Sequence, residues 1–138
     1  MDIILREPSD AEFALIKSHI AEYALDDREL MRGQFSAAFR NKELVGFGRL
    51  RQHPECTELC SLGVITSLRR KGIGKAIVRD LLQRTADDIY LVCIIPAFFT
   101  PFNFRITPDY PASISGKLHY CTKALAVPEE YVVMLRKA

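Results

Sequence analysis

A strand, a basic loop and an amphipathic helix follow one another directly in the sequence, and this succession limits the possible folds. The segment ECTELCSLGVI (residues 55–65) has the composition of a strand, and the loop SLRRKGIG (residues 67–74) comes after it. Apolar residues then recur at helical spacing, which predicts a helix with one apolar face. They are Ile73, Ile77, Val78, Leu81 and Leu82. This order predicts a sheet covered by a helix whose N-terminus points at a cationic loop.

The rest of the chain adds further strands and an earlier helix. Ser9 and Glu12 form a capping box ahead of apolar positions at helical spacing, which predicts a helix in residues 9–25. A shorter helical piece is expected in residues 26–33. Strand patterns occupy residues 3–7, 35–52 (a hairpin that turns at residues 40–42), 89–95 and 129–137. This order favours an α+β fold with a central mixed, mostly antiparallel sheet flanked by helices over a doubly wound parallel sheet.

Length and charge limit the class of protein. A chain of 138 residues is expected to form one domain, residues 1–138. Its 19 Lys and Arg against 17 Asp and Glu leave a net charge of only +2, so bulk charge indicates neither a nucleic-acid-binding nor a membrane-binding protein. The first residues do not form a signal peptide, and no apolar run approaches ~18 residues. We therefore expect a cytoplasmic protein.

The cysteines predict neither a metal site nor a disulfide framework. Cys56, Cys60, Cys93 and Cys121 contain no CxxC pair, and only three histidines could complete a site. We expect reduced, mostly buried thiols and no metal.

The glycine loop fails two familiar nucleotide-binding patterns. In a dinucleotide fingerprint the third glycine place would fall on Ile77, and in a Walker loop Arg69 and Ala76 would occupy the places of glycine and Ser or Thr. What remains is a helix N-terminus whose unpaired amides attract phosphate, surrounded by cations, and a pyrophosphate would fit it. The alternative is a glycine-rich helix entry with a solvated basic face.

The segment LGVITSLRRKGIGKAIV (residues 62–78) resembles the acetyl-CoA signature of the GCN5-related N-acetyltransferase (GNAT) superfamily. Arg69, Gly72 and Gly74 occupy the three defining places of its R/Q-x-x-G-x-G/A motif. The flanking segments in residues 34–104 resemble the family's neighbouring strands in the same order. The C-terminal segment YPASISGKLHYCTKAL resembles the amino-acid acetyltransferase branch typified by N-acetylglutamate synthase domains.

The resemblance implies direct transfer of an acetyl group from acetyl-CoA, the cosubstrate, to a primary amine without an acyl-enzyme intermediate. It implies that backbone amides at Leu62, Gly63 and Val64, turned outward by a bulge, hold the pantetheine arm and polarise the thioester. The pyrophosphate is then expected on the basic loop and the first helical turn. Those residues are Arg69, Arg70, Lys71, Gly72, Ile73, Gly74 and Lys75.

Glu58 is the candidate general base, directly or through water. It lies four residues before Leu62, so both side chains point to one face of an ideal strand, and it matches the place of a general-base Glu in several relatives. A base is needed because an amine with a pKa near ~10.4 is almost wholly protonated at pH 7. A strand Glu in an ion pair is the alternative. Phe99 stands where many relatives have a Tyr as general acid, and Asn103 replaces a familiar glycine.

The acceptor remains open between classes. A small-molecule amine or amino acid is expected first, with Arg49, Arg51 or Lys117 as candidate partners of a substrate carboxylate or, alternatively, plain surface charges. A protein or peptide acetyltransferase is the alternative enzyme, and an acyl-CoA-binding sensor module without turnover is the alternative of another class, which Phe99 keeps open. A nucleic-acid-binding loop would need interleaved aromatic residues that SLRRKGIGK lacks. The resemblance also implies a homodimer.

Overall fold

The computed structural model describes residues 2–125 and 127–138. They form two compact units: residues up to Leu50 together with Cys60–Thr85 (unit 1), and Arg51–Leu59 together with Ala86–Ala138 (unit 2). Unit 1 contains β1 (Ile4–Arg6), α1 (Asp10–Glu22), β2 (Phe35–Arg40), most of β3 (Glu43–Gln52), the end of β4 (Thr57–Val64) and α2 (Ile73–Leu82). Unit 2 contains the start of β4, β5 (Ile89–Cys93), α3 (Pro96–Phe99), β6 (Arg105–Ile106), α4 (Ala112–Ala124) and β7 (Val132–Arg136).

The strands follow the order β1-β2-β3-β4-β5-β7-β6. The pairs β1–β2, β2–β3, β5–β7 and β6–β7 are antiparallel, whereas β4 and β5 pair in parallel at Thr57↔Ile89 and Glu58↔Tyr90. The prediction of a mixed, mostly antiparallel sheet with helices is therefore confirmed. The hairpin of β2 and β3 turns through Asn41 and Lys42, both at positive φ (50° and 66°), as the right-handed twist of paired strands requires.

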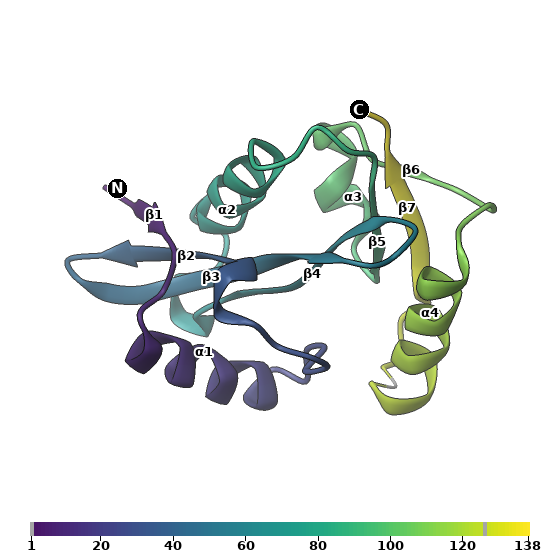
Figure 1. The fold of residues 1–138 in the computed structure, drawn as a ribbon. Helices are drawn as coiled ribbons and strands as arrows, with labels where there is room; N and C mark the ends of the chain where they lie inside the picture. The colour runs from purple at the N-terminus through teal and green to yellow at the C-terminus, as the bar shows by residue number, and fades with distance from the viewer. Residues whose placement is uncertain (1, 126) are drawn as a thin grey trace. The chain divides into compact units, whose positions relative to one another are not determined.

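In unit 1 the two helices cover opposite faces of the strands (Figure 1). Side chains alternate along β3, so Phe47 joins the buried cluster against α1, while Gly46 and Gly48 face α2. A Cβ at Gly46 would lie 2.8 Å from Cδ1 of Ile77. The two strand glycines therefore allow α2 to pack closely against β3.

The predicted helices at both ends of unit 1 are confirmed, but the short helical piece in residues 26–33 is wrong. Ser9 and Glu12 form the expected capping box of α1, and α2 buries Ile73, Ile77, Val78 and Leu81. Between α1 and β2 the chain forms a loop with one turn of 3-10 helix, Arg32–Gln34. The Asp26 carboxylate accepts a hydrogen bond from the Arg28 amide, 3.0 Å away, and such a turn competes with helical bonding.

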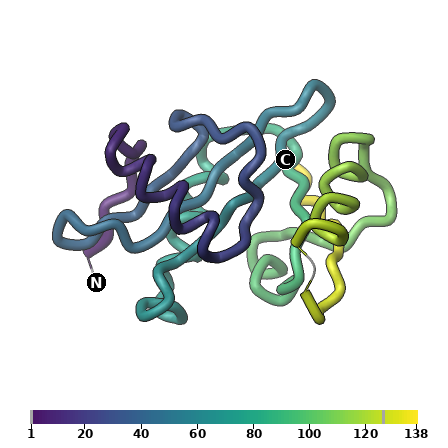
Figure 2. Tube along the Cα trace, turned by 90° about the horizontal axis from the view of Figure 1, so that it is seen from below, coloured from purple at the N-terminus to yellow at the C-terminus, as the bar shows by residue number. Residues whose placement is uncertain are grey.

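In unit 2 the trace of α4 leads back into β7, which runs antiparallel to β5 (Figure 2). Between β5 and β7 the chain forms α3, the short β6 and the thirteen-residue α4. None of the helices among the described residues is long and apolar enough to cross a bilayer.

Candidate functional site

The strand that leads into the basic loop is distorted immediately before the predicted cofactor-binding residues. Ser61 has a left-handed backbone, with φ of 54°, which interrupts the regular pleat of β4 one residue ahead of Leu62. After the strand ends, the amide of Ile65 donates to the carbonyl of Val45 over 3.0 Å. Gly63 has a packing role here, because a Cβ at this position would lie 2.7 Å from the ring of Phe47.

Arg49 holds this distorted strand to the loop that follows α1. Its Nε donates to Oγ of Ser61 (3.0 Å), which in turn donates to the carbonyl of Asp26 (2.8 Å). Its Nη1 and Nη2 donate to Oε1 of Gln34 (2.9 Å) and to the carbonyl of Arg28 (3.0 Å). Arg49 has no exposed surface. The expectation that it is a surface charge or binds a substrate carboxylate is therefore wrong: every one of these contacts is internal to unit 1.

Arg69 stabilises the start of the basic loop through two contacts within unit 1. Its Nε donates to the carbonyl of Val64 (3.0 Å), and its guanidinium lies 4.9 Å from the ring centroid of Tyr23. The Tyr23 hydroxyl accepts a hydrogen bond from the amide of Thr66 (3.2 Å). The first arginine of the motif thus fixes the path of the loop as well as contributing charge. No sequence pattern indicated a role for Tyr23, which is the C-cap residue of α1.

The entry to α2 leaves the first helical turn open. Gly72 is the N-cap of α2, with φ of 85°, and it has no side chain that could accept hydrogen bonds from the first amides. The helix begins its backbone hydrogen bonding where the amide of Ala76 donates to the carbonyl of Gly72. The amides of Ile73, Gly74 and Lys75 therefore keep the unpaired character of a helix start. Arg69, Arg70, Lys71, Gly72 and Lys75 are exposed, Gly74 is half-buried and the Ile73 side chain is buried. An anion can reach these amides and the surrounding cations from solvent.

Glu58, the candidate base, lies in unit 2 and has no exposed surface. Its Oε2 accepts a hydrogen bond from Nζ of Lys117 on α4 at 2.6 Å, and its Oε1 lies 2.8 Å from Nε2 of His53. Lys117 is only 4% exposed, so it is neither a surface charge nor an accessible partner for a substrate carboxylate. Sequence reasoning missed both partners of Glu58, because no pattern links residues on separate elements of the fold.

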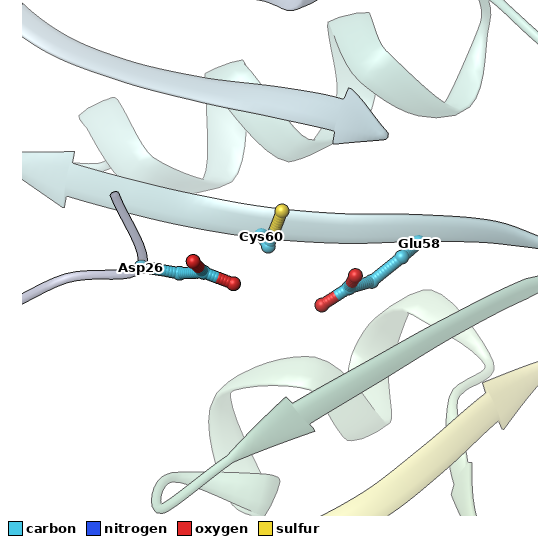
Figure 3. A group of neighbouring side chains, drawn as sticks. All are labelled: Asp26, Glu58 and Cys60. Atoms are coloured by element: carbon cyan, nitrogen blue, oxygen red, sulfur yellow. The ribbon is translucent and has the colours of Figure 1, made fainter. Parts of the chain in front are cut away.

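Figure 3 shows Glu58 with Cys60, the next residue but one on β4, and Asp26 from the loop after α1. Each of the two carboxylates has a cationic partner within its own unit. Asp26 pairs with Arg28 at 3.0 Å and Glu58 pairs with Lys117 at 2.6 Å. The charges are therefore compensated by the protein itself.

Phe99 is buried within a group of phenylalanine rings in unit 2. It contacts Phe98 and Phe104 edge to face, with centroids 4.9 and 5.8 Å apart. This position supplies no hydroxyl to protonate a leaving thiolate. Asn103 adopts φ of 69° and ψ of 21°, the left-handed conformation that glycine adopts most readily and asparagine tolerates.

Two of the four thiols, those of Cys56 and Cys93, are held in the protonated form. None of the four cysteines forms a disulfide, and three of them are buried, as expected. Burial raises the pKa of the Cys56 and Cys93 thiols to about 11. Both groups are therefore protonated at neutral pH, the form that neither attacks carbonyls nor binds metal.

A mixed sheet with a distorted strand that feeds a basic, uncapped helix N-terminus defines an α+β domain suited to a cofactor with a pyrophosphate. The chain belongs to the acetyltransferase (GNAT) family, whose model matches residues 3–97. Acetyl-CoA is the cosubstrate of this family of acyltransferases. The comparison with curated proteins gave no match.

Solved structures share the fold at low sequence identity. N-acetylglutamate synthase from Neisseria gonorrhoeae, complexed with coenzyme A and N-acetyl-glutamate, has a TM-score of 0.78 and 14% identity over 99% of this chain and 35% of that chain. This chain thus spans about a third of that enzyme. Rv2747 from Mycobacterium tuberculosis, in complex with CoA and NLQ, has a TM-score of 0.78 and 19% identity over 98% and 99% of the two chains. Arabidopsis thaliana Naa50, in complex with the bisubstrate analogue CoA-Ac-MVNAL, has a TM-score of 0.63 and 19% identity over the full length of both chains.

Proposed function

We propose that the protein transfers an acetyl group from acetyl-CoA directly to the primary amine of a small molecule or amino acid. The binding of acetyl-CoA is supported by the uncapped first turn of α2, which follows Gly72. The exposed side chains of Lys71 and Lys75 flank this turn. Unpaired amides and cations at a helix N-terminus bind phosphate oxygens. Ahead of this turn, the distorted β4 would present the amides of Leu62, Gly63 and Val64 to the pantetheine arm and the thioester oxygen.

In this scheme the chain binds both substrates and removes protons. The acceptor arrives as an ammonium and must lose one proton before its nitrogen can attack the thioester carbonyl carbon. The C–N bond forms, the C–S bond breaks, and the nitrogen loses a second proton while the CoA thiolate takes one up. Glu58 is the candidate proton acceptor, directly or through an intermediary, and with Phe99 in place the thiolate would take its proton from water.

Calorimetric titration with acetyl-CoA tests the cofactor part. Lys71→Ala/Lys75→Ala removes two loop cations without touching Arg69, whose contacts with Tyr23 and Val64 are structural. Lys17→Ala/Lys42→Ala is the matched control, since it removes two exposed lysines elsewhere in unit 1. We expect the loop variant to lose affinity at least about tenfold, equivalent to about 1.4 kcal/mol, and the control to bind like the wild type. Equal affinity in all three would remove the pyrophosphate from this loop.

The acceptor class is tested separately with a panel of amines. Amino acids, polyamines and short peptides with free N-termini are offered at equal concentration with acetyl-CoA, and release of the CoA thiol is measured. A preference for amino acids or polyamines supports the proposal. Peptide preference would favour the alternative of a protein acetyltransferase, for which Naa50 provides a structural parallel with its peptide-bearing analogue. Binding of acetyl-CoA without turnover would favour a sensor module, the alternative supported by the missing hydroxyl at Phe99.

A further inference from the structure

Glu58 is closed off from any substrate by its own partners. The side chain has no exposed surface, Oε2 is bound by Lys117 at 2.6 Å and Oε1 by His53 at 2.8 Å. A general base must come within about 3 Å of the proton that it removes. The carboxylate therefore reaches an amine only through one of the groups that surround it.

His53 is the more exposed of the two partners of Glu58. Its side chain keeps 11% of its surface exposed, compared with 4% for Lys117. Its backbone is fixed, because its amide donates to the carbonyl of Cys56 (2.8 Å) and its carbonyl accepts from Nε2 of Gln52 (3.0 Å). A carboxylate beside Nε2 favours the tautomer with the proton on that nitrogen, which leaves the lone pair on Nδ1. Among the residues that the structure describes, Nδ1 makes no hydrogen bond with the protein.

We infer that His53 is the catalytic base of the proposed acetyl transfer, with Glu58 and Lys117 as positioning residues behind it. This rests on the proposed function. The acceptor ammonium gives a proton to Nδ1 of His53, and the neutral amine then attacks the thioester carbonyl carbon. The imidazolium keeps its Nε2 proton toward the Glu58 carboxylate, which stabilises the positive charge. The proton on Nδ1 passes to solvent before the next turnover.

Lys117 fixes the carboxylate in this arrangement. An ammonium buried to this degree is costly unless a carboxylate compensates it, so the pair holds Glu58 in one rotamer, with Oε1 toward His53. Within unit 2, Cys56 interacts electrostatically with Glu58, and Tyr131 with Lys117. Burial is the main cause that raises the pKa of Cys56 and of Tyr131, which keeps them neutral, and the positive charge of Lys117 partly opposes the rise for Tyr131.

The decisive variant is His53→Gln. A glutamine amide can still donate a hydrogen bond to Glu58 but has no nitrogen that accepts a proton. We expect kcat to fall about 100-fold or more, the range of a lost general base, while the calorimetric affinity for acetyl-CoA is unchanged. His119→Gln, the same change at an exposed histidine of unit 2, is the matched control and should keep wild-type kcat. His53→Ala should regain part of its kcat when imidazole is added, a rescue that a merely structural role would not produce.

The outcomes separate this inference from the function beneath it. Wild-type kcat in His53→Gln, or no imidazole rescue of a folded His53→Ala protein, overturns the role of His53 while acetyl transfer stands. Binding of acetyl-CoA without turnover of any amine by the wild type overturns both. Nitrogen NMR of the neutral ring gives a readout independent of turnover. A proton on Nε2 is expected, and a proton on Nδ1 would contradict the assignment.

Discussion

At the scale of single residues, Gly72 is the position where backbone conformation alone requires glycine. Its φ is 85°, and a Cβ there would have no atom within 4 Å, so crowding is no obstacle. An L-residue in this region costs roughly 1–2 kcal/mol. We expect Gly72→Ala to lower the free energy of unfolding, measured in urea, by about that amount.

Asn103 provides the opposite case for the same experiment. It already adopts φ of 69° with a side chain, so Asn103→Gly should leave stability unchanged or raise it slightly. If Gly72→Ala proved as stable as the wild type, α2 would have to start at another residue in solution.

The charged residues show where reasoning from sequence reaches its limit. Arg69, Gly72 and Gly74 could be singled out, because a motif within one short segment fixes a loop and a helix start. The contacts of Arg49, His53 and Lys117 could not be predicted, because they depend on how the chain packs. In the sequence, a buried arginine such as Arg49 cannot be told apart from an exposed arginine. Its contacts with Ser61, Gln34 and the carbonyl of Arg28 show that it is buried.

At the scale of elements, the start of α1 is tied to β1 by an acid-sensitive contact. Glu12 accepts two hydrogen bonds from Arg6, both 2.8 Å, and one from the Ser9 amide. The Arg6 side chain first, and then the Ser9 amide, lower the pKa of Glu12 to about 2. Because the folded pKa lies below the ordinary 4.5, this contact stabilises the fold above about pH 4.5. That contribution is lost as the pH falls toward 2.

In the Glu12→Gln variant, the free energy of unfolding should therefore depend less on pH below about pH 5. Urea unfolding at pH 5 and pH 2.5 measures the difference. We expect the variant to be less stable than the wild type at pH 5 and to lose less between the two values. Both residues are partly exposed, so solvent screening keeps the effect small. An equal loss in both proteins would show that Glu12 has no depressed pKa.

The contact between α4 and β4 has larger consequences, because both charges are buried. Lys117→Met leaves Glu58 without its ammonium, and breaking a buried pair on one side costs about 3–5 kcal/mol. Adding Glu58→Gln should restore most of that loss, since an amide carries no charge to compensate. Unfolding in urea of the two single variants and the double variant measures the coupling. Additive losses would mean that the two charges do not interact in solution.

The same lysine explains why α4 was not predicted. Ile114, Lys117 and Cys121 form the buried side of the helix at spacings of three and four residues. A lysine in the middle breaks the apolar stripe that predicts a helix, and the prolines before and after the segment indicate loops. α2 was predicted because its buried side is wholly apolar. A helix was therefore predictable where its buried side is apolar, and not where a buried ion pair interrupts that side.

At the scale of the whole molecule, acetyl-CoA should stabilise the protein against heat if the loop binds it. A ligand at 100 times its Kd adds about 2.7 kcal/mol of stability, which corresponds to a rise in Tm of roughly 10 °C for a chain of this size. Pantetheine, which lacks the pyrophosphate, should raise Tm much less. Differential scanning calorimetry with each compound measures the difference.

The Gly74→Glu variant tests directly whether the pyrophosphate binds at the first turn of α2. The substitution places a carboxylate in the first turn of α2, where it would repel a pyrophosphate while itself favouring the helix dipole. Gly116→Glu on α4 is the matched control, since a Cβ there meets nothing within 4 Å. Both variants replace a helical glycine and should keep or raise the Tm of the free protein. Only Gly74→Glu should lose the shift with acetyl-CoA. An undiminished shift in Gly74→Glu would place the pyrophosphate away from α2 and remove the observation on which the proposed function rests.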